Sequence, residues 1–153
     1  MIKTRLPKGV VVINKYLFRG KRKDNGEWVE GFLVSLDKYT YICTGKLDIT
    51  KGFPMFEQYE VFPESVGMFT GITDKNNKKI FEDDLHKIVT KNKKEALFRV
   101  GYGRYYDYQS EQGQYGWYFL NVKTGDCNSF YGTEASYTNI IGNVHDNPEL
   151  LEV

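Results

Sequence analysis

The sequence has few of the residues that form disulfide bonds or structural metal sites in small proteins. Two cysteines and two histidines occur in 153 residues. Cys43 and Cys127 lie far apart in the sequence and form no disulfide framework, which fits two free thiols in a reducing cytoplasm. Structural zinc sites bring their ligands as closely spaced pairs, and no such pair includes His86 or His145. We therefore expect no disulfide scaffold, no metal and no cofactor.

Long hydrophobic runs are also missing. The apolar run 10–13 ends after four residues at Asn14 and Lys15, whereas a secretory signal needs about 7–15 apolar residues. A membrane-spanning helix needs about 20, and no window of the sequence approaches that length. We expect a protein that stays in the cytoplasm and makes no membrane contact.

Proline is scarce and aromatic residues are abundant. The chain has 4 Pro and 15 Gly beside 12 Tyr, 10 Phe and 2 Trp, and aromatic residues make up 16% of it. Aromatic and β-branched residues favour strands, and turn signals such as Asp24-Asn25-Gly26 and 74–77 recur at short intervals. No stretch of more than ten residues in the middle of the chain has a helical apolar period. The sequence predicts an all-β fold, either a barrel or curled antiparallel sheets, with a short C-terminal helical turn at Asn147-Pro148-Glu149.

Charge is unevenly distributed along the chain. The first 23 residues hold eight cations and no anion, whereas the rest holds thirteen cations and twenty anions. Such a basic arm can steer a chain to nucleic acid. We favour the simpler explanation that the arm is solvated or pairs with the acidic body of a neighbouring subunit. If nucleic acid is bound, the candidate contacts are Arg19, Lys21, Arg22 and Lys23.

The sequence contains no recognisable catalytic motif. Cys127 follows a Gly-Asp turn but has no recognisable nucleophile signature. The acidic run 82–84 fails the EF-hand template, because Lys78 and Lys79 stand where a ligand and a glycine are required. We therefore expect a protein that is not an enzyme and binds no identifiable small molecule.

A cluster of tyrosine and arginine is the most informative pattern for function. Tyrosines interleaved with arginine on a β surface can stack single-stranded bases, but both residue types are also enriched at protein interfaces. Because acidic residues surround the cluster, we place protein contact ahead of nucleic acid. The candidate interaction surface consists of Arg99, Tyr102, Arg104, Tyr105, Tyr106, Tyr108, Tyr115 and Trp117.

Five sequence blocks carry a family resemblance in their order and spacing. They are Phe18-Arg19-Gly20-Lys21, Gly26-Glu27-Trp28-Val29-Glu30-Gly31, the run 61–76 from Val61 to Asn76, Ile80-Phe81-Glu82-Asp83-Asp84-Leu85, and the run 141–151 that contains Gly142-Asn143-Val144-His145-Asp146. Together they resemble the YopX family of bacteriophage and prophage proteins. The family usually has Glu-Gly-Asp where this chain has Glu82-Asp83-Asp84, so Asp83 stands in place of a glycine.

The resemblance implies a small, mostly β, barrel-like protein of a phage or prophage, kept in the bacterial cytoplasm. It implies no activity, because the family is a set of proteins of unknown function. Residues 1–17 form a basic extension outside the resemblance, and 18–153 form a single domain with a possible seam between two lobes near 63–67.

Two functional hypotheses remain open. The first is a non-enzymatic interaction protein that binds itself as a homo-oligomer, or a host or phage protein, through the Tyr/Arg surface. The alternative is a nucleic-acid-binding accessory protein that uses the basic arm together with the Tyr/Arg surface.

Overall fold

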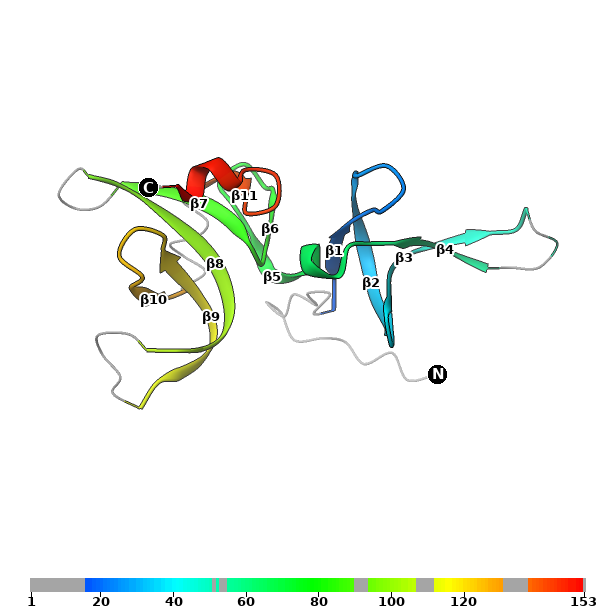
Figure 1. Cartoon of the computed structure of the whole chain (residues 1–153), viewed down its shortest axis with the longest axis horizontal. Coiled ribbons are helices and arrows are strands. Elements are labelled where there is room, and N and C mark those ends of the chain that lie inside the picture. Colours follow the sequence, from blue (N-terminus) through cyan, green and yellow to red (C-terminus); the bar gives the residue numbers. More distant parts are fainter. Residues whose placement is uncertain are drawn as a thin grey trace, which may run out of the picture.

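The computed structural model describes residues 16–50, 52, 55–89, 94–106, 112–130 and 138–152. Within these ranges the chain forms antiparallel strands and two short 3-10 helices, so the predicted β-dominated fold is confirmed (Figure 1). The elements are β1 (Phe18–Lys21), β2 (Trp28–Leu36), β3 (Tyr39–Asp48), β4 (Met55–Glu60), η1 (Pro63–Ser65), β5 (Gly67–Thr73), β6 (Lys79–Phe81), β7 (Asp84–Val89), β8 (Glu95–Tyr105), β9 (Gln114–Asn121), β10 (Cys127–Ser129), β11 (Asn139–Asn143) and η2 (Pro148–Leu151).

The strands form two antiparallel sheets. One has the order β4-β3-β2-β1-β5-β6 and the other β10-β9-β8-β7-β11. Figure 1 shows β1–β4 in one half of the molecule and β5–β11 in the other, with η1 between them and with β8 and β9 strongly bent. Among the described strands neither sheet pairs its first strand with its last, so the predicted barrel is not confirmed. The boundary between an extension and a single domain stays a prediction, and residues 1–15 lie outside the described ranges.

Local turn chemistry produces the hairpins that the sequence predicts. β1 and β2 pair from Phe18 opposite Gly31 to Lys21 opposite Trp28, and Gly26 takes a φ of 75° in the turn between them. Between β5 and β6, Asn77 has a φ of 61° and its N–H donates to the carbonyl of Asp74 at 3.0 Å. Asparagine and glycine tolerate this left-handed conformation better than other residues.

Two strands lie where local sequence signals are weak or point to a strand end. The Gly45-Lys46 pair does not end β3, which continues to Asp48 through a register shift between Cys43 and Leu47. Such a bulge lets a strand absorb a glycine and keep its pairing. Residues Cys127–Ser129 form β10, although their sequence has no apolar alternation. The apolar side chains of this strand pair belong to its partner β9.

The hydrophobic core lies on one face of the β7–β8–β9 sheet. Ile80 of β6 packs there with Phe98, Val100 and Phe119, each at most 8% exposed. Val100 lies directly opposite Phe119 across the β8–β9 pair, so the period of two places both side chains on the same face. This arrangement fixes which residues of β8 and β9 point into the molecule and which continue the same face towards solvent.

The C-terminal helical turn is present as η2. Asn147 occupies the N-cap position and proline opens the helix, as predicted, but the Asn147 side chain makes no capping hydrogen bond. It accepts instead from the backbone N–H of Asn143 at 3.3 Å. In the part of the chain that the structure describes, no helix is both long and apolar enough to cross a membrane.

Candidate functional site

The structure brings together five aromatic and arginine side chains at the outer end of β8 and β9. Tyr102 lies opposite Trp117, and Arg104 opposite Tyr115. The Tyr102 ring centroid lies 4.9 Å from that of Trp117 and 5.4 Å from that of Tyr115. Tyr106 follows β8, and the Arg104 guanidinium lies 5.5 Å from its ring centroid. We call Tyr102, Arg104, Tyr106, Tyr115 and Trp117 the tyrosine face.

Two members of the predicted surface point the other way. Tyr105 is 6% exposed, and its hydroxyl lies 2.9 Å from both Gln114 Oε1 and Ser129 Oγ. Arg99 Nη2 lies 2.6 Å from Asp83 Oδ1. The predicted surface grouped residues that are close together in the sequence. Side chains alternate between the two faces of a strand, however, so Arg99 and Tyr105 lie on the face opposite to Tyr102 and Arg104. Tyr108 lies outside the described residues.

The tyrosine face continues a row of rings that begins in the core. Phe98 contacts Phe119, Phe119 contacts Phe130, and Phe130 contacts Trp117, with ring centroids 6.0, 4.6 and 6.4 Å apart. Trp117 then contacts Tyr102, which is 40% exposed, and Tyr115 beyond it is 74% exposed. Rings supported in this way are already ordered, so a partner that contacts them pays little side-chain entropy.

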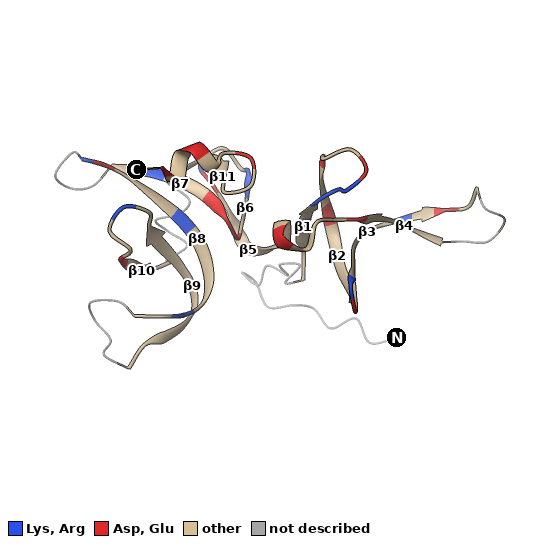
Figure 2. Ribbon diagram, viewed as in Figure 1, with Lys and Arg blue, Asp and Glu red and all other residues tan. Residues whose placement is uncertain are grey.

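The four candidate nucleic-acid contacts are each engaged in an ion pair within the chain. Figure 2 shows acidic residues beside basic ones along the β1–β2 hairpin. The pairs are Arg19–Asp84 at 2.7 Å, Lys21–Asp146 at 2.7 Å, Arg22–Asp24 at 2.6 Å and Lys23–Glu60 at 2.6 Å. An internal carboxylate competes with phosphate for each cation, which lowers the positive potential of this part of the arm.

A second apolar surface lies on β2 and β3, away from the predicted one. Phe32, Val34, Leu36 and Tyr39 are 48%, 38%, 65% and 46% exposed. Leu36 lies opposite Tyr39, and Val34 opposite Tyr41, so these side chains share one face of the sheet. The sequence shows the alternation at 32, 34 and 36, but alternation alone does not say which face stays open to solvent.

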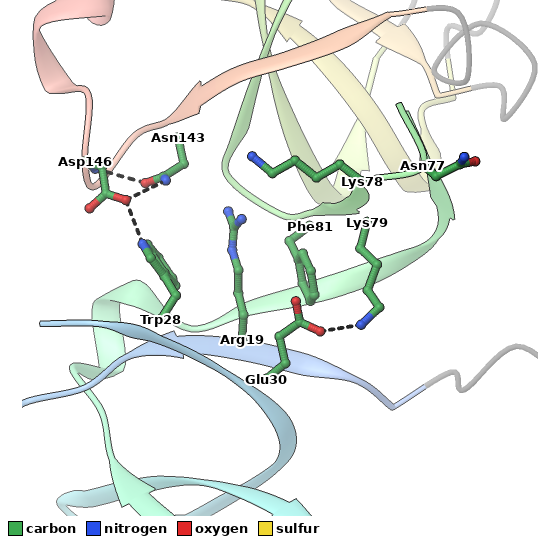
Figure 3. Close-up of a pocket in the computed structure, with 9 residues that line it drawn as sticks. All are labelled: Arg19, Trp28, Glu30, Asn77, Lys78, Lys79, Phe81, Asn143 and Asp146. Atoms are coloured by element: carbon green, nitrogen blue, oxygen red, sulfur yellow. Dashed lines mark hydrogen bonds and ion pairs between the residues drawn. The ribbon is translucent and has the colours of Figure 1, made fainter. Parts of the chain in front are cut away.

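A pocket of about 490 Å³ lies where β1 and β2 meet β6 and the 143–146 segment (Figure 3). Arg19 rises from β1 between two rings, with its guanidinium 4.7 Å from the Trp28 centroid and 4.9 Å from that of Phe81. Its Nη2 atom pairs with Asp84 Oδ1 and donates to the carbonyl of Glu82 at 3.2 Å. Aromatic faces attract a guanidinium and fix its plane.

The carboxylates beside this pocket have different environments. Burial raises the pKa of Asp84, although Arg19 and the Phe81 N–H at 2.8 Å both favour its charged form. Burial would also raise the pKa of Asp146. Hydrogen bonds from Lys21, Asn143 and the Trp28 indole outweigh it and lower that pKa to about 2. Asp146 therefore stays charged and ties β1 and β2 to the 143–146 segment.

The two histidines and Cys127 each lie in a different environment. His86 is fully buried, and its Nδ1 lies 2.6 Å from Thr138 Oγ1. Burial lowers the pKa of His86 to about 4, so its imidazole is neutral near pH 7. His145 Nε2 lies 3.1 Å from Asp83 Oδ2, and burial raises the pKa of the Cys127 thiol, which disfavours the nucleophilic thiolate. No group of three His, Cys, Asp or Glu side chains that could hold a metal occurs among the described residues.

A family model described as YopX protein matches residues 17–152, which include every described strand. The chain belongs to the YopX family. No curated protein matches it. Family membership covers both the tyrosine face and the pocket, and it leaves their function to be argued from their geometry.

Proposed function

We propose that this YopX-family protein is a non-enzymatic protein-interaction module of a phage or prophage that works in the bacterial cytoplasm. It self-assembles, or it binds a host or phage protein, through the tyrosine face. The observation that carries this proposal is the row of rings that runs from the core through Trp117 to the exposed Tyr102 and Tyr115.

The composition of the tyrosine face supports protein contact. Tyrosine, tryptophan and arginine are the residues that most often supply binding energy at protein interfaces. No ion pair with a described carboxylate engages Arg104; its Nη2 donates to the carbonyl of Gln112 at 3.3 Å. The apolar face of Phe32, Val34 and Leu36 adds a second exposed surface of the kind that marks interaction sites.

Nucleic-acid binding is the alternative function. The exposed tyrosines beside Arg104 favour it, since aromatic rings and cations together hold single strands. The ion pairs of Arg19, Lys21, Arg22 and Lys23 weigh against a role for these cations, because each phosphate contact must break one of them. We therefore keep protein contact as the leading proposal.

Light scattering coupled to size-exclusion chromatography tests self-assembly. We expect the full chain to be larger than a monomer, and the double variant Tyr106→Ser/Tyr115→Ser to shift towards monomer. Tyr16→Ser is the matched control, because Tyr16 is 70% exposed and Tyr115 is 74% exposed. An equal change of molecular mass in the double variant and in Tyr16→Ser would show that the tyrosine face does not mediate self-assembly.

A monomeric result leads to a second experiment on the same protein. The tagged chain is used to capture partners from a bacterial lysate, with and without nuclease. A captured protein that survives nuclease and is lost in Tyr106→Ser/Tyr115→Ser supports the proposal. Capture that nuclease abolishes supports the nucleic-acid alternative, and a monomer that captures nothing contradicts both.

A further inference from the structure

The pocket around Arg19 has a chemistry that the proposed protein contact does not use. Its walls come from three separate segments: the β1–β2 hairpin, β6 with the turn before it, and the 143–146 segment (Figure 3). A volume of about 490 Å³ lies in the range of pockets that take small molecules, which runs from about 300 to 1,000 Å³.

The carboxylates in and beside this pocket are already engaged by cations of the chain. Glu30 Oε2 forms an ion pair with Lys79 Nζ. Asp146 uses Oδ1 for Lys21 Nζ at 2.7 Å and Oδ2 for the Trp28 indole at 2.6 Å. Asp84 pairs with Arg19 beneath the pocket. A cationic ligand would therefore have to displace an existing partner.

Among the described residues, Lys78 is the cation of this pocket without an ion pair. Arg19 is 8% exposed, its Nη2 is engaged by Asp84 and by the carbonyl of Glu82, and its Nε is buried. Lys78 lines the pocket and is exposed, and no described side chain forms an ion pair with it. Figure 3 shows the Lys78 side chain extended across the view of the pocket that Arg19 also lines. Lys78 also acts on the charge of Asp84, the partner of Arg19.

Asp84 already balances the charge of Arg19, so Lys78 is the cation to which an anionic ligand adds a missing partner. Arg19 is held in one plane by Trp28 and Phe81 and uses Nη2 for Asp84, whereas Lys78 supplies a mobile point charge. A lysine at a pocket whose carboxylates are already engaged suits phosphate, which carries negative charge and several acceptor oxygens.

We propose that this pocket binds the phosphate group of a small molecule, with Lys78 as its cationic donor beside the guanidinium of Arg19. The pocket is larger than one phosphate ion, so an organic phosphate fits it as well as the inorganic ion does. This site is separate from the tyrosine face and does not depend on the proposed protein contact.

Nuclear magnetic resonance offers a direct test on the full chain. The protein has two tryptophans, so its indole N–H signals are two, and Trp28→Phe assigns the one in the pocket. We expect that signal to shift saturably on addition of inorganic phosphate or adenosine monophosphate, with ionic strength held constant by sodium chloride. Tighter binding of the nucleotide would identify an organic phosphate as the ligand, and equal binding would identify the inorganic ion.

The decisive variant is Lys78→Gln, because Lys78 is exposed and its loss does not disturb the core. We expect it to weaken binding of both probes by about tenfold. The matched control is Lys75→Gln, an exposed lysine of the same turn that does not line the pocket. The absence of a saturable shift up to about 20 mM phosphate, or equal binding by Lys78→Gln and Lys75→Gln, would overturn the proposal. Neither result alters the oligomeric state that tests the tyrosine face.

Discussion

At the residue scale, Asp83 shows how one position serves both the backbone and a polar cluster. Its φ is 69°, and its backbone is clamped by the carbonyl of Val100 at 2.9 Å and the N–H of Val144 at 3.1 Å. Glycine takes this conformation without strain, which explains the glycine of the family motif. Aspartate tolerates it better than most residues, and here its carboxylate adds contacts to Arg99 and His145.

Replacing Asp83 by glycine and by alanine separates the backbone contribution from the carboxylate contribution. Both variants lose the contacts with Arg99 and His145, so they differ only in how well they take a φ of 69°. We expect Asp83→Gly to be more stable than Asp83→Ala by about 1 kcal/mol, because a side chain in the left-handed region costs about that much. Urea unfolding of the two variants measures the difference.

Ser35 provides the control for this comparison. It lies in β2 and is exposed, and it is not among the described residues with positive φ. At an ordinary strand position glycine is the less stable of the two residues, by about 0.5–1 kcal/mol. The sign of the glycine-minus-alanine difference should therefore be opposite at the two sites. The same sign at both would show that the backbone at Asp83 is not strained.

At the scale of elements, local sequence signals mark many of the strands, whereas they do not reveal the pocket. Alternation and turn residues are local signals, and they mark strands such as β2 and β9 in the sequence. The short β10 has no such signal. The pocket is assembled from segments separated by more than a hundred residues, such as Trp28 and Asp146, and only long-range sheet pairing brings them together. Likewise, sheet closure depends on pairing between distant strands, which local patterns do not encode.

The ion pair between Arg19 and Asp84 connects β1 to β7. The side chains of Arg19 and Asp84 are 10% and 1% exposed. We expect Arg19→Met to destabilise the protein by about 3 kcal/mol, because it leaves a buried carboxylate without its partner. Methionine keeps apolar volume between Trp28 and Phe81, so the loss reports on charge more than on packing.

The double variant Arg19→Met/Asp84→Asn should lose less free energy of unfolding than the two single variants lose together, since it leaves no buried charge without a partner. Burial raises the pKa of Asp84, and loss of Arg19 raises it further. A raised folded-state pKa gives stability at low pH that is lost as pH rises, so the defect of Arg19→Met should be smaller at pH 5 than at pH 7. Additive losses, or a defect independent of pH, would contradict this account.

At the scale of the whole molecule, the apolar core is concentrated on one side. Phe98, Val100 and Phe119 are buried between β6 and the β7–β9 sheet. On the β2–β4 side Ile42 and Val61 are buried, while Phe32 and Leu36 remain 48% and 65% exposed. The two exposed surfaces therefore differ in what lies beneath them. The tyrosine face packs on the apolar core, whereas the β2–β3 face belongs to a sheet that buries few apolar side chains.

This asymmetry predicts that the two sides open with different free energies. In native-state hydrogen exchange followed by mass spectrometry, we expect amides at the centre of β8 and β9 to exchange at least about tenfold more slowly than those of β3 and β4, because local opening follows buried apolar contact. Peptides from β7 serve as an internal reference, since Leu85 and His86 are fully buried. Equal protection on both sides would mean that the connections through β1, including Arg19–Asp84, make the molecule one cooperative unit. Slower exchange in β3 and β4 would show that contacts on the β2–β3 face, such as those of self-assembly, protect it in solution.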